Sequence, residues 1–200
     1  MDDNIILGKM LTGDEIEREV FLGGMLTGEE IERQIRLGNI EIDPFDKTCI
    51  NPNSYNLKLY PELVTYSNTI IDMHQDNPIK KFTIDDNGIV LMPNILYLGR
   101  TVERCKSDKF IPMINGRSSG GRLGISIHIC AGFGDIGFAG YWTLELFCLQ
   151  PIMIYPNADI CQIYYHDIHG EYDLYNSGKY QNNTGVQPSL MYKDFEQKEK

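Results

Sequence analysis

The stretch Tyr141–Cys148, YWTLELFC, decides the fold class because its apolar and polar side chains alternate. The apolar residues at every second position are Trp142, Leu144, Leu146 and Cys148. Successive side chains of a β-strand point to opposite faces, so this alternation indicates a strand with one buried face. The other face would carry Tyr141, Thr143, Glu145 and Phe147.

Similar short β-type runs occupy most of the chain after Asn39, and Pro, Asn, Asp and Gly separate them. They include SYNLKLY from Ser54, GIVLMPNILYLGRTVE from Gly88, LGISIHICAGF from Leu123 and ICQIYYHDI from Ile160. No long helical pattern lies between these runs. The sequence therefore predicts a mainly β protein, built as a distorted β-barrel or a jelly-roll-like sandwich.

The N-terminal part contains a tandem repeat, in which MLTGDEIEREVFLGG (Met10–Gly24) is followed directly by MLTGEEIERQIRLGN (Met25–Asn39). Each copy carries a T-x-x-E capping box and predicts one short helix. Two copies with a period of 15 residues are too few and too short for a solenoid. We expect residues 1–24 to be an extension, residues 25–175 to form the β domain and residues 176–200 to be a mobile C-terminal segment.

Composition and charge exclude several classes of partner. The chain has 18 Lys and Arg against 28 Asp and Glu, a formal charge of −10, which argues against nucleic acids and anionic membranes. It has neither a long apolar run nor the start of a signal peptide, so we expect a soluble, cytoplasmic protein. Five cysteines at irregular spacings, without a C-x-x-C, indicate buried free thiols rather than a structural zinc site.

Charged residues are scarce between positions 111 and 165, and four of them fall in one glycine-rich stretch. These four are Arg117, Arg122, Asp135 and Glu145. Taken singly, each is explained as a structural or solvated residue. Together they are harder to dismiss, because unpaired charges in an apolar segment are costly. Two arginines and two serines in a glycine loop would hold an anion, and each carboxylate would activate a water.

Two other sequence motifs are matched only in part. Residues 132–137 match G-x-G-x-x-G, but the aromatic, alternating stretch that follows predicts a strand, whereas a dinucleotide site requires a helix there. The residues His169, Gly170 and Glu171 match the H-x-E of zinc nucleobase deaminases, but P-C-x-x-C is missing. Deaminase chemistry in this chain would therefore run without zinc.

Several motifs from Met25 onward, taken together, are specific. They are MLTGEEIERQI, NPNSYNLKL, INGRSSGGRLGISIH, AGFGDIGFAGYWTLEL and GKYQNNTGVQPSL. In these motifs the chain resembles the dCTP deaminase branch of the trimeric dUTPase superfamily. The resemblance implies a β-clip fold, a homotrimer with sites between subunits, and dCTP as substrate, with dUTP as a further candidate. It also implies Mg²⁺ bound through the substrate triphosphate, and a C-terminal segment that closes the site.

The resemblance also implies roles for individual residues. Glu145 matches the catalytic acid and base, and Asp135, Ser118 and Arg122 match residues that position water, sugar or charge. The implied substrate-binding residues are Arg117, Ser118, Ser119, Gly120, Gly121, Arg122, Asp135, Thr143, Leu144, Glu145, Gln162, Tyr175, Lys179 and Asn183. None of them is expected to bind a metal directly. In such a site Glu145 would take a proton from the attacking water and return protons to the ring nitrogen and the departing ammonia.

The pair that follows Ala131 decides between two activities within the family. Members that only deaminate typically have His-Arg at this place, whereas this chain has Gly132 and Phe133, as in the subgroup that forms dUMP. We therefore expect dCTP and two waters to give dUMP, pyrophosphate and ammonia. The alternatives are a deaminase that releases dUTP only, a non-catalytic nucleotide-binding member and a generic β module.

Four positions depart from the family pattern. The family usually has an apolar residue at Gly120, Thr or Asn at Cys130 and Ile or Val at Gly134, so these positions predict a looser site. The closing motif K-Y-x-x-Q ends here in Asn183, one methylene shorter than the usual phosphate-binding Gln. Gln181 is a candidate substitute.

Overall fold

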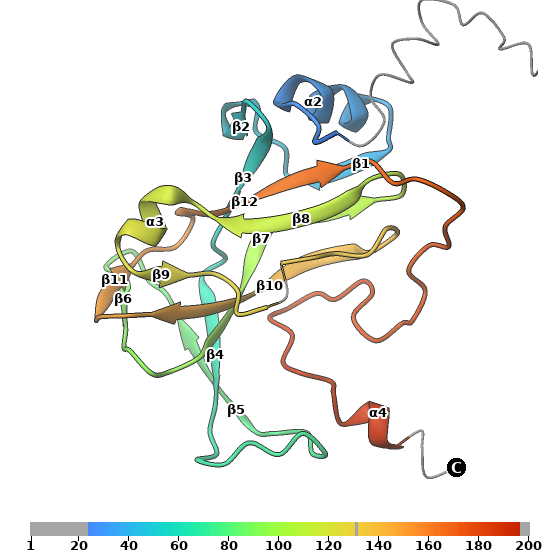
Figure 1. Cartoon of the computed structure of the whole chain (residues 1–200). Helices are drawn as coiled ribbons and strands as arrows, with labels where there is room; N and C mark the ends of the chain where they lie inside the picture. Colours follow the sequence, from blue (N-terminus) through green and yellow to red (C-terminus); the bar gives the residue numbers. More distant parts are fainter. Residues whose placement is uncertain (1–23, 131, 197–200) are drawn as a thin grey trace, which may run out of the picture.

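The computed structural model describes residues 24–130 and 132–196, and the helix predicted in the first repeat copy lies outside them. Antiparallel sheets dominate the described part (Figure 1). A six-stranded sheet contains β5 (Ile79–Thr83), β4 (Glu62–Tyr66), β7 (Tyr97–Ser107), β10 (Ala139–Cys148) and β9 (Ile125–Ser126), with β1 (Ile40–Asp43) also paired to β7. A four-stranded sheet has the order β2 (Ile50–Asn51), β3 (Ser54–Lys58), β12 (Asp159–His166) and β8 (Ile111–Gly116).

The remaining elements are small. The strands β6 (Ile89–Leu91) and β11 (Ile152–Ile154) form a two-stranded sheet. Helical elements are α2 (Gly28–Arg36), the 3-10 turn η1 (Lys47–Cys49), α3 (Ser118–Arg122) and α4 (Lys193–Glu196). The mainly β class is confirmed. Within the described residues the sheets form no closed barrel, because the path of the six-stranded sheet ends at β5 on one side and at β9 on the other.

Helix α2 begins where the capping box of the second repeat copy predicts. The Thr27 hydroxyl accepts a hydrogen bond from the Glu30 backbone N–H at 3.2 Å, and Gly38 adopts a φ of +75° just past the last turn. The Glu30 carboxylate does not return to the N-cap residue; it accepts hydrogen bonds from the side chains of Arg33 and Gln34. The helix is held on the sheets by Ile31, which is fully buried.

The alternation in β10 is confirmed residue by residue. Trp142, Leu144, Leu146 and Cys148 are buried in the core, and the residues between them are half-buried on the opposite face. Because β10 pairs along β7 through the middle of the six-stranded sheet, its second face is held in a fixed place. One strand therefore supplies part of the core on one side and Thr143 and Glu145 on the other.

Three further expectations are tested by the fold. The residues after Gly137 form β10, so the dinucleotide motif lacks the helix that it requires. All five cysteines are free; four are buried, and Cys130 is exposed. No helix in the described ranges is long and apolar enough to cross a membrane.

The C-terminal segment, which the sequence predicts to be mobile, lies docked on the body of the molecule as far as Glu196 (Figure 1). The Asn182 N–H donates to the Ala139 carbonyl at 2.7 Å, and the Ser189 N–H donates to the Tyr66 hydroxyl at 3.0 Å. Farther along, the rings of His74 and Phe195 stack with their centroids 3.7 Å apart. The segment thus runs from β10 to the loop between β4 and β5.

Candidate active site

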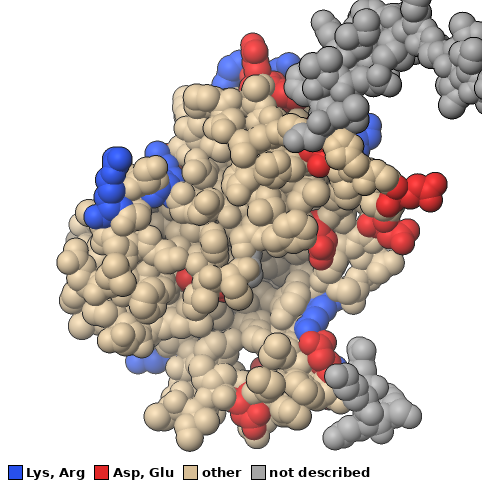
Figure 2. Space-filling model, in the orientation of Figure 1, with Lys and Arg blue, Asp and Glu red and all other residues tan. Residues whose placement is uncertain are grey.

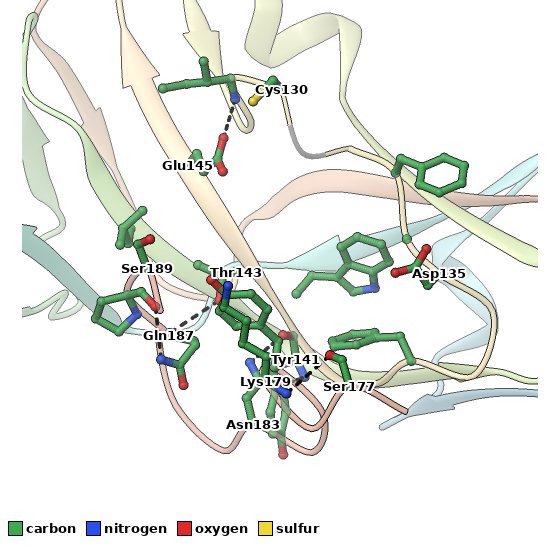
Figure 3. Close-up of a pocket in the computed structure, with 18 of the residues that line it drawn as sticks. Cys130, Asp135, Tyr141, Thr143, Glu145, Ser177, Lys179, Asn183, Gln187 and Ser189 are labelled. Carbon is green, nitrogen blue, oxygen red and sulfur yellow. Dashed lines mark hydrogen bonds between the residues drawn. The ribbon is translucent and has the colours of Figure 1, made fainter. Parts of the chain in front are cut away.

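A cavity of about 730 Å³ lies between β10, the segment before β10 and the docked C-terminal segment. Its volume is within the range of sites for small molecules. Its lining includes Asp135, Tyr141, Thr143, Glu145, Tyr175, Lys179 and Asn183, with Phe133 at its edge. Figure 3 shows Glu145 and Asp135 on different sides of this cavity, while Lys179, Ser177 and Asn183 lie together on the C-terminal segment.

Glu145 is held by the backbone of a neighbouring segment. Its Oε2 accepts a hydrogen bond from the Ile129 N–H at 2.7 Å, and its own N–H donates to the Ile127 carbonyl at 2.9 Å. Its Oε1 has no hydrogen-bond partner among the described residues. One carboxylate oxygen is therefore fixed, and the other is available to a water or a substrate in the cavity.

Asp135 is presented by the turn that precedes β10. The Phe138 N–H donates to the Asp135 carbonyl at 3.2 Å, and Gly137 takes a φ of +87°, which only glycine adopts readily. The Tyr175 N–H donates to the Ile136 carbonyl at 2.6 Å, which ties the start of the C-terminal segment to this turn, since Tyr175 directly precedes it. The Asp135 side chain is exposed to the cavity.

Lys179 lines the cavity but already has an anionic partner. Its Nζ lies 2.8 and 2.7 Å from the two carboxylate oxygens of Asp194, fifteen residues farther along the C-terminal segment. The Lys179 side chain is mostly buried, whereas that of Asp194 is mostly exposed. A phosphate that approached Lys179 would therefore compete with a carboxylate on the same chain.

The glycine loop lies in a different place. Arg117, Ser118 and Gly121 line a second hollow of about 320 Å³, beside β9 and His128. Ser119, Gly121 and Arg122 are exposed on α3, and basic side chains project at the edge of the molecule that carries this helix (Figure 2). None of residues 117–122 lines the cavity around Glu145.

A polar network on β3 and β12 holds the start of this loop. Arg117 donates from Nη1 to the Asp159 carbonyl at 3.0 Å, and its guanidinium lies 3.7 Å from the Asp159 carboxylate. That carboxylate accepts a hydrogen bond from the Asn56 amide at 3.1 Å. Arg117 is thus oriented by its own chain, whereas Arg122 forms no ion pair with another described residue.

Gln162 belongs to the same network and not to the cavity. Its Oε1 accepts from the Ser54 hydroxyl at 2.9 Å, and its Nε2 donates to the Gly116 carbonyl at 3.3 Å. Leu144 is fully buried in the core, so its side chain reaches neither hollow. The predicted substrate-binding residues therefore fall into two groups, one at the cavity and one at the loop.

Beneath the loop network lies a buried carboxylate. Glu103 on β7 is 1% exposed and accepts a hydrogen bond from the Lys58 N–H at 2.9 Å. Burial raises the pKa of Glu103, because the charged carboxylate loses its hydration.

Two glycines shape the wall next to the cavity. A Cβ on Gly132 would lie 2.8 Å from the Ile114 carbonyl oxygen, and one on Gly134 would lie 2.4 Å from the Trp142 ring. The expectation that Gly134 loosens the site is therefore wrong, because Trp142 occupies the space that a side chain would need. Phe133, between them, is 61% exposed.

Several cavity residues were missed at the level of sequence. Tyr141 could have been found, because it continues the alternation of Thr143 and Glu145 on the same face of β10. Gln187, whose N–H lies 3.4 Å from the Thr143 hydroxyl, and Asp194 carry no sequence signal, since docking of the C-terminal segment alone brings them near the site. Within the described residues, no group of three or more His, Cys, Asp or Glu side chains could hold a metal ion.

A mainly antiparallel β fold that gathers an anchored glutamate, an aspartate and a lysine around one cavity defines a β-sheet protein with a pocket of small-molecule size. More particularly, the chain belongs to the dCTP deaminase-like family, whose model matches residues 25–168.

Similar proteins are named alike. A protein of Clostridium beijerinckii named dCTP deaminase, dUMP-forming, is 66% identical over 158 residues, which are 79% of this chain and 91% of that protein. A protein of Hathewaya histolytica with the same name is 63% identical, over 79% of this chain and 92% of that protein. Among solved structures, 2′-deoxycytidine 5′-triphosphate deaminase from Agrobacterium tumefaciens matches with a TM-score of 0.57 at 19% identity. The match covers 74% of this chain and 49% of that one, and it shows the fold.

Proposed function

We propose that this protein hydrolyses dCTP to dUMP, pyrophosphate and ammonia, with the consumption of two waters. The observation that carries the proposal is Glu145, which is anchored through one oxygen at the wall of a nucleotide-sized cavity. Relatives at 60–66% identity that are named dCTP deaminase, dUMP-forming, support the same reaction, as does the pair Gly132 and Phe133.

In the proposed deamination Glu145 acts as both base and acid. Its unbonded oxygen takes a proton from a water as that water attacks the amino-bearing carbon of cytosine. The carboxylic acid passes this proton to the ring nitrogen. The carboxylate then takes the proton of the newly added hydroxyl and delivers it to the amino group, which leaves as ammonia. The hydrogen bond from the Ile129 N–H keeps the carboxylate in one orientation during both transfers.

The triphosphate would be bound by residues of the glycine loop and by one lysine of the C-terminal segment. Arg117, Ser118, Ser119 and Arg122 would bind the phosphates and orient the attacking water, with Lys179 facing them from the C-terminal segment. Asp135 would hold the sugar and direct a second water at the α-phosphorus. Mg²⁺ fits this scheme as an ion carried by the triphosphate, where it would neutralise phosphate charge. The charged side chains proposed to bind the phosphates are cations, and the described residues contain no cluster of metal ligands.

We further propose that the protein works as a homotrimer in which the glycine loop of one copy completes the cavity of another. The proposal is supported by the separation of the two groups of residues within one chain. The cavity holds Glu145 and Asp135 without the loop, and the loop leads to its own small hollow. A site between copies would bring the two groups together without any rearrangement of the fold.

The test is to incubate the purified protein with dCTP or dUTP and Mg²⁺ and to measure ammonia, nucleotides and pyrophosphate. Formation of dUMP from both substrates supports the proposal. Accumulation of dUTP from dCTP would show a deaminase without the second step, and tight nucleotide binding without turnover would show a non-catalytic member. A zinc-specific chelator is expected to leave the rate unchanged.

A further inference from the structure

The C-terminal segment is attached to β10 through two side-chain amides. The Oε1 of Gln181 accepts from the Ala139 N–H at 2.9 Å, and its Nε2 donates to the Gly137 carbonyl at 2.7 Å. Two residues later, the Oδ1 of Asn183 accepts from the Tyr141 N–H at 2.8 Å, and its Nδ2 donates to the Tyr141 carbonyl at 2.9 Å. Each amide thus offers one donor and one acceptor to the backbone, as a peptide group of a neighbouring strand would.

The two amides bind backbone N–H groups that are two residues apart, at Ala139 and Tyr141, and these groups point to the same edge of the strand. Ala139 and Tyr141 pair on one side with Lys106 and Arg104 of β7, while β9 pairs only with the far end of β10. The other edge of β10 near Ala139 therefore needs partners, because unpaired N–H and C=O groups on a strand edge are costly when covered. The two amides, together with the backbone hydrogen bond from Asn182 to Ala139, supply these partners.

The glycine at position 140 of β10 leaves room for the side chain of Asn183. A Cβ built on Gly140 would lie 2.2 Å from the Asn183 Oδ1, so the side chain of Asn183 occupies space that any other residue at position 140 would take. The amide of Asn183 is consequently used for docking. This differs from the expected role of the corresponding Gln as a phosphate ligand.

We propose that Gln181 and Asn183 are positioning residues, which dock the C-terminal segment on β10 and thereby fix Lys179 and Tyr175 at the cavity. We call the hydrogen bonds of Gln181 and Asn183 to residues 137–141 the clamp. Lys179 lies only two residues before Gln181, so the place of its ammonium group depends on this clamp. The proposed effect on catalysis rests on the proposed function, whereas the clamp itself does not.

The first experiment measures amide hydrogen exchange of the full-length protein without nucleotide, in the wild type and in Asn183→Ala, Gln181→Ala and Gln150→Ala. Gln150 is an exposed amide in the turn after β10 and serves as the control. Exchange is expected to accelerate about tenfold at the Tyr141 N–H in Asn183→Ala and at the Ala139 N–H in Gln181→Ala, because each of these N–H groups loses its hydrogen-bond acceptor. Unchanged exchange at both amides would overturn the clamp.

The second experiment measures the kinetics of dCTP turnover. In Asn183→Ala the KM is expected to rise about tenfold with kcat within about twofold of the wild type, since saturating nucleotide holds the segment in place. Asn183→Gln gives the sharpest distinction. A clamp predicts a raised KM, because the longer side chain cannot make both hydrogen bonds to Tyr141, whereas a phosphate ligand predicts a lowered KM. A lowered KM would overturn the positioning role.

The two experiments also keep the proposals apart. If the wild-type protein turns over no dCTP while exchange responds as expected, the proposed function fails and the clamp stands. If dCTP is turned over normally by every clamp variant, Gln181 and Asn183 have no positioning role, and the proposed function stands.

Discussion

The cavity around Glu145 and the loop Arg117–Arg122 differ in how completely one chain organises them. In the cavity, a backbone N–H group holds the Glu145 carboxylate, the turn before β10 presents Asp135, and the docked C-terminal segment carries Lys179. In the loop only Arg117 is held, by Asp159, and the residues after it project from a short helix at the edge of the molecule. The group proposed for proton transfer is therefore preorganised within one chain, whereas most of the proposed phosphate donors are presented outward.

This difference has a physical reason. A general base must keep its orientation through several proton transfers, and Glu145 is fixed by hydrogen bonds with Ile127 and Ile129, in the segment that directly follows β9. A phosphate loop needs free donors, and donors that were satisfied within the chain would be lost to the ligand. A loop that serves another copy accordingly remains exposed until assembly and substrate binding.

The largest expected effect tests the cavity side of this comparison. Replacing Glu145 by Gln removes the base while keeping a hydrogen-bond acceptor for the Ile129 N–H, so ammonia release from dCTP is expected to fall roughly 10³-fold. The matched control is Glu29→Gln, an exposed glutamate on α2. If ammonia release falls less than tenfold in Glu145→Gln, another residue is the base.

The loop side is tested by mixing two inactive variants. Arg122→Ala alone is expected to lose about 10²-fold in rate, because a charge-stabilising donor is removed. Co-expression of Arg122→Ala with Glu145→Gln in equal amounts should restore roughly one quarter of the wild-type activity if each site takes its loop from another copy of a cyclic assembly. If each loop served the cavity of its own chain, the mixture would stay as inactive as its components.

A smaller effect, on the KM for dCTP, is expected at Lys179, where the cavity and the loop of another copy would both contact the substrate phosphates. Asp194→Asn removes the carboxylate that now pairs with Lys179, so the KM for dCTP should fall roughly threefold with kcat unchanged, as suits an exposed ion pair. The comparison uses Asp86→Asn, an exposed site away from the cavity, measured at low and at physiological salt. A rise in KM would mean that Asp194 positions Lys179 and does not compete with the substrate.

The smallest effect concerns Glu103, the buried carboxylate near Asp159. The raised pKa of Glu103 means that folding penalises its charged form. Stability is therefore fully retained below the ordinary pKa of 4.5 and is lost as the pH rises through the raised value. Glu103→Gln avoids this cost and should raise the Tm at neutral pH by roughly 2 °C, with no gain near pH 4. Thermal unfolding across this pH range checks the result, and an equal gain at both pH values would contradict the role of ionisation.

Much of the fold could be predicted because its signals are local. The capping residue Thr27 and the terminal Gly38 mark both ends of α2, and the alternation in Tyr141–Cys148 predicts which side chains are buried. The same alternation places Thr143 and Glu145 on the face that lines the cavity. These features depend on residues that lie close together in the chain.

The rest depends on contacts across the fold, and the sequence pattern does not carry them. The polar composition of the C-terminal segment indicates mobility, but the hydrogen bonds of Gln181 and Asn183 to β10 dock it. The pairing of Lys179 with Asp194 arises from that docking. Gly134 suggests a gap only until the Trp142 ring is placed against it, and the separation of residues 117–122 from Glu145 is visible only in three dimensions.

The division of β10 into a core face and a functional face has a consequence for how this sequence can vary. Inserting or deleting a single residue inside Ala139–Cys148 would exchange the two faces beyond that point, which would expose Leu146 and bury Glu145. Stability and activity would then be lost in one mutational step. Length changes in this protein should consequently be confined to its loops and its ends, while the number of residues in β10 stays constant.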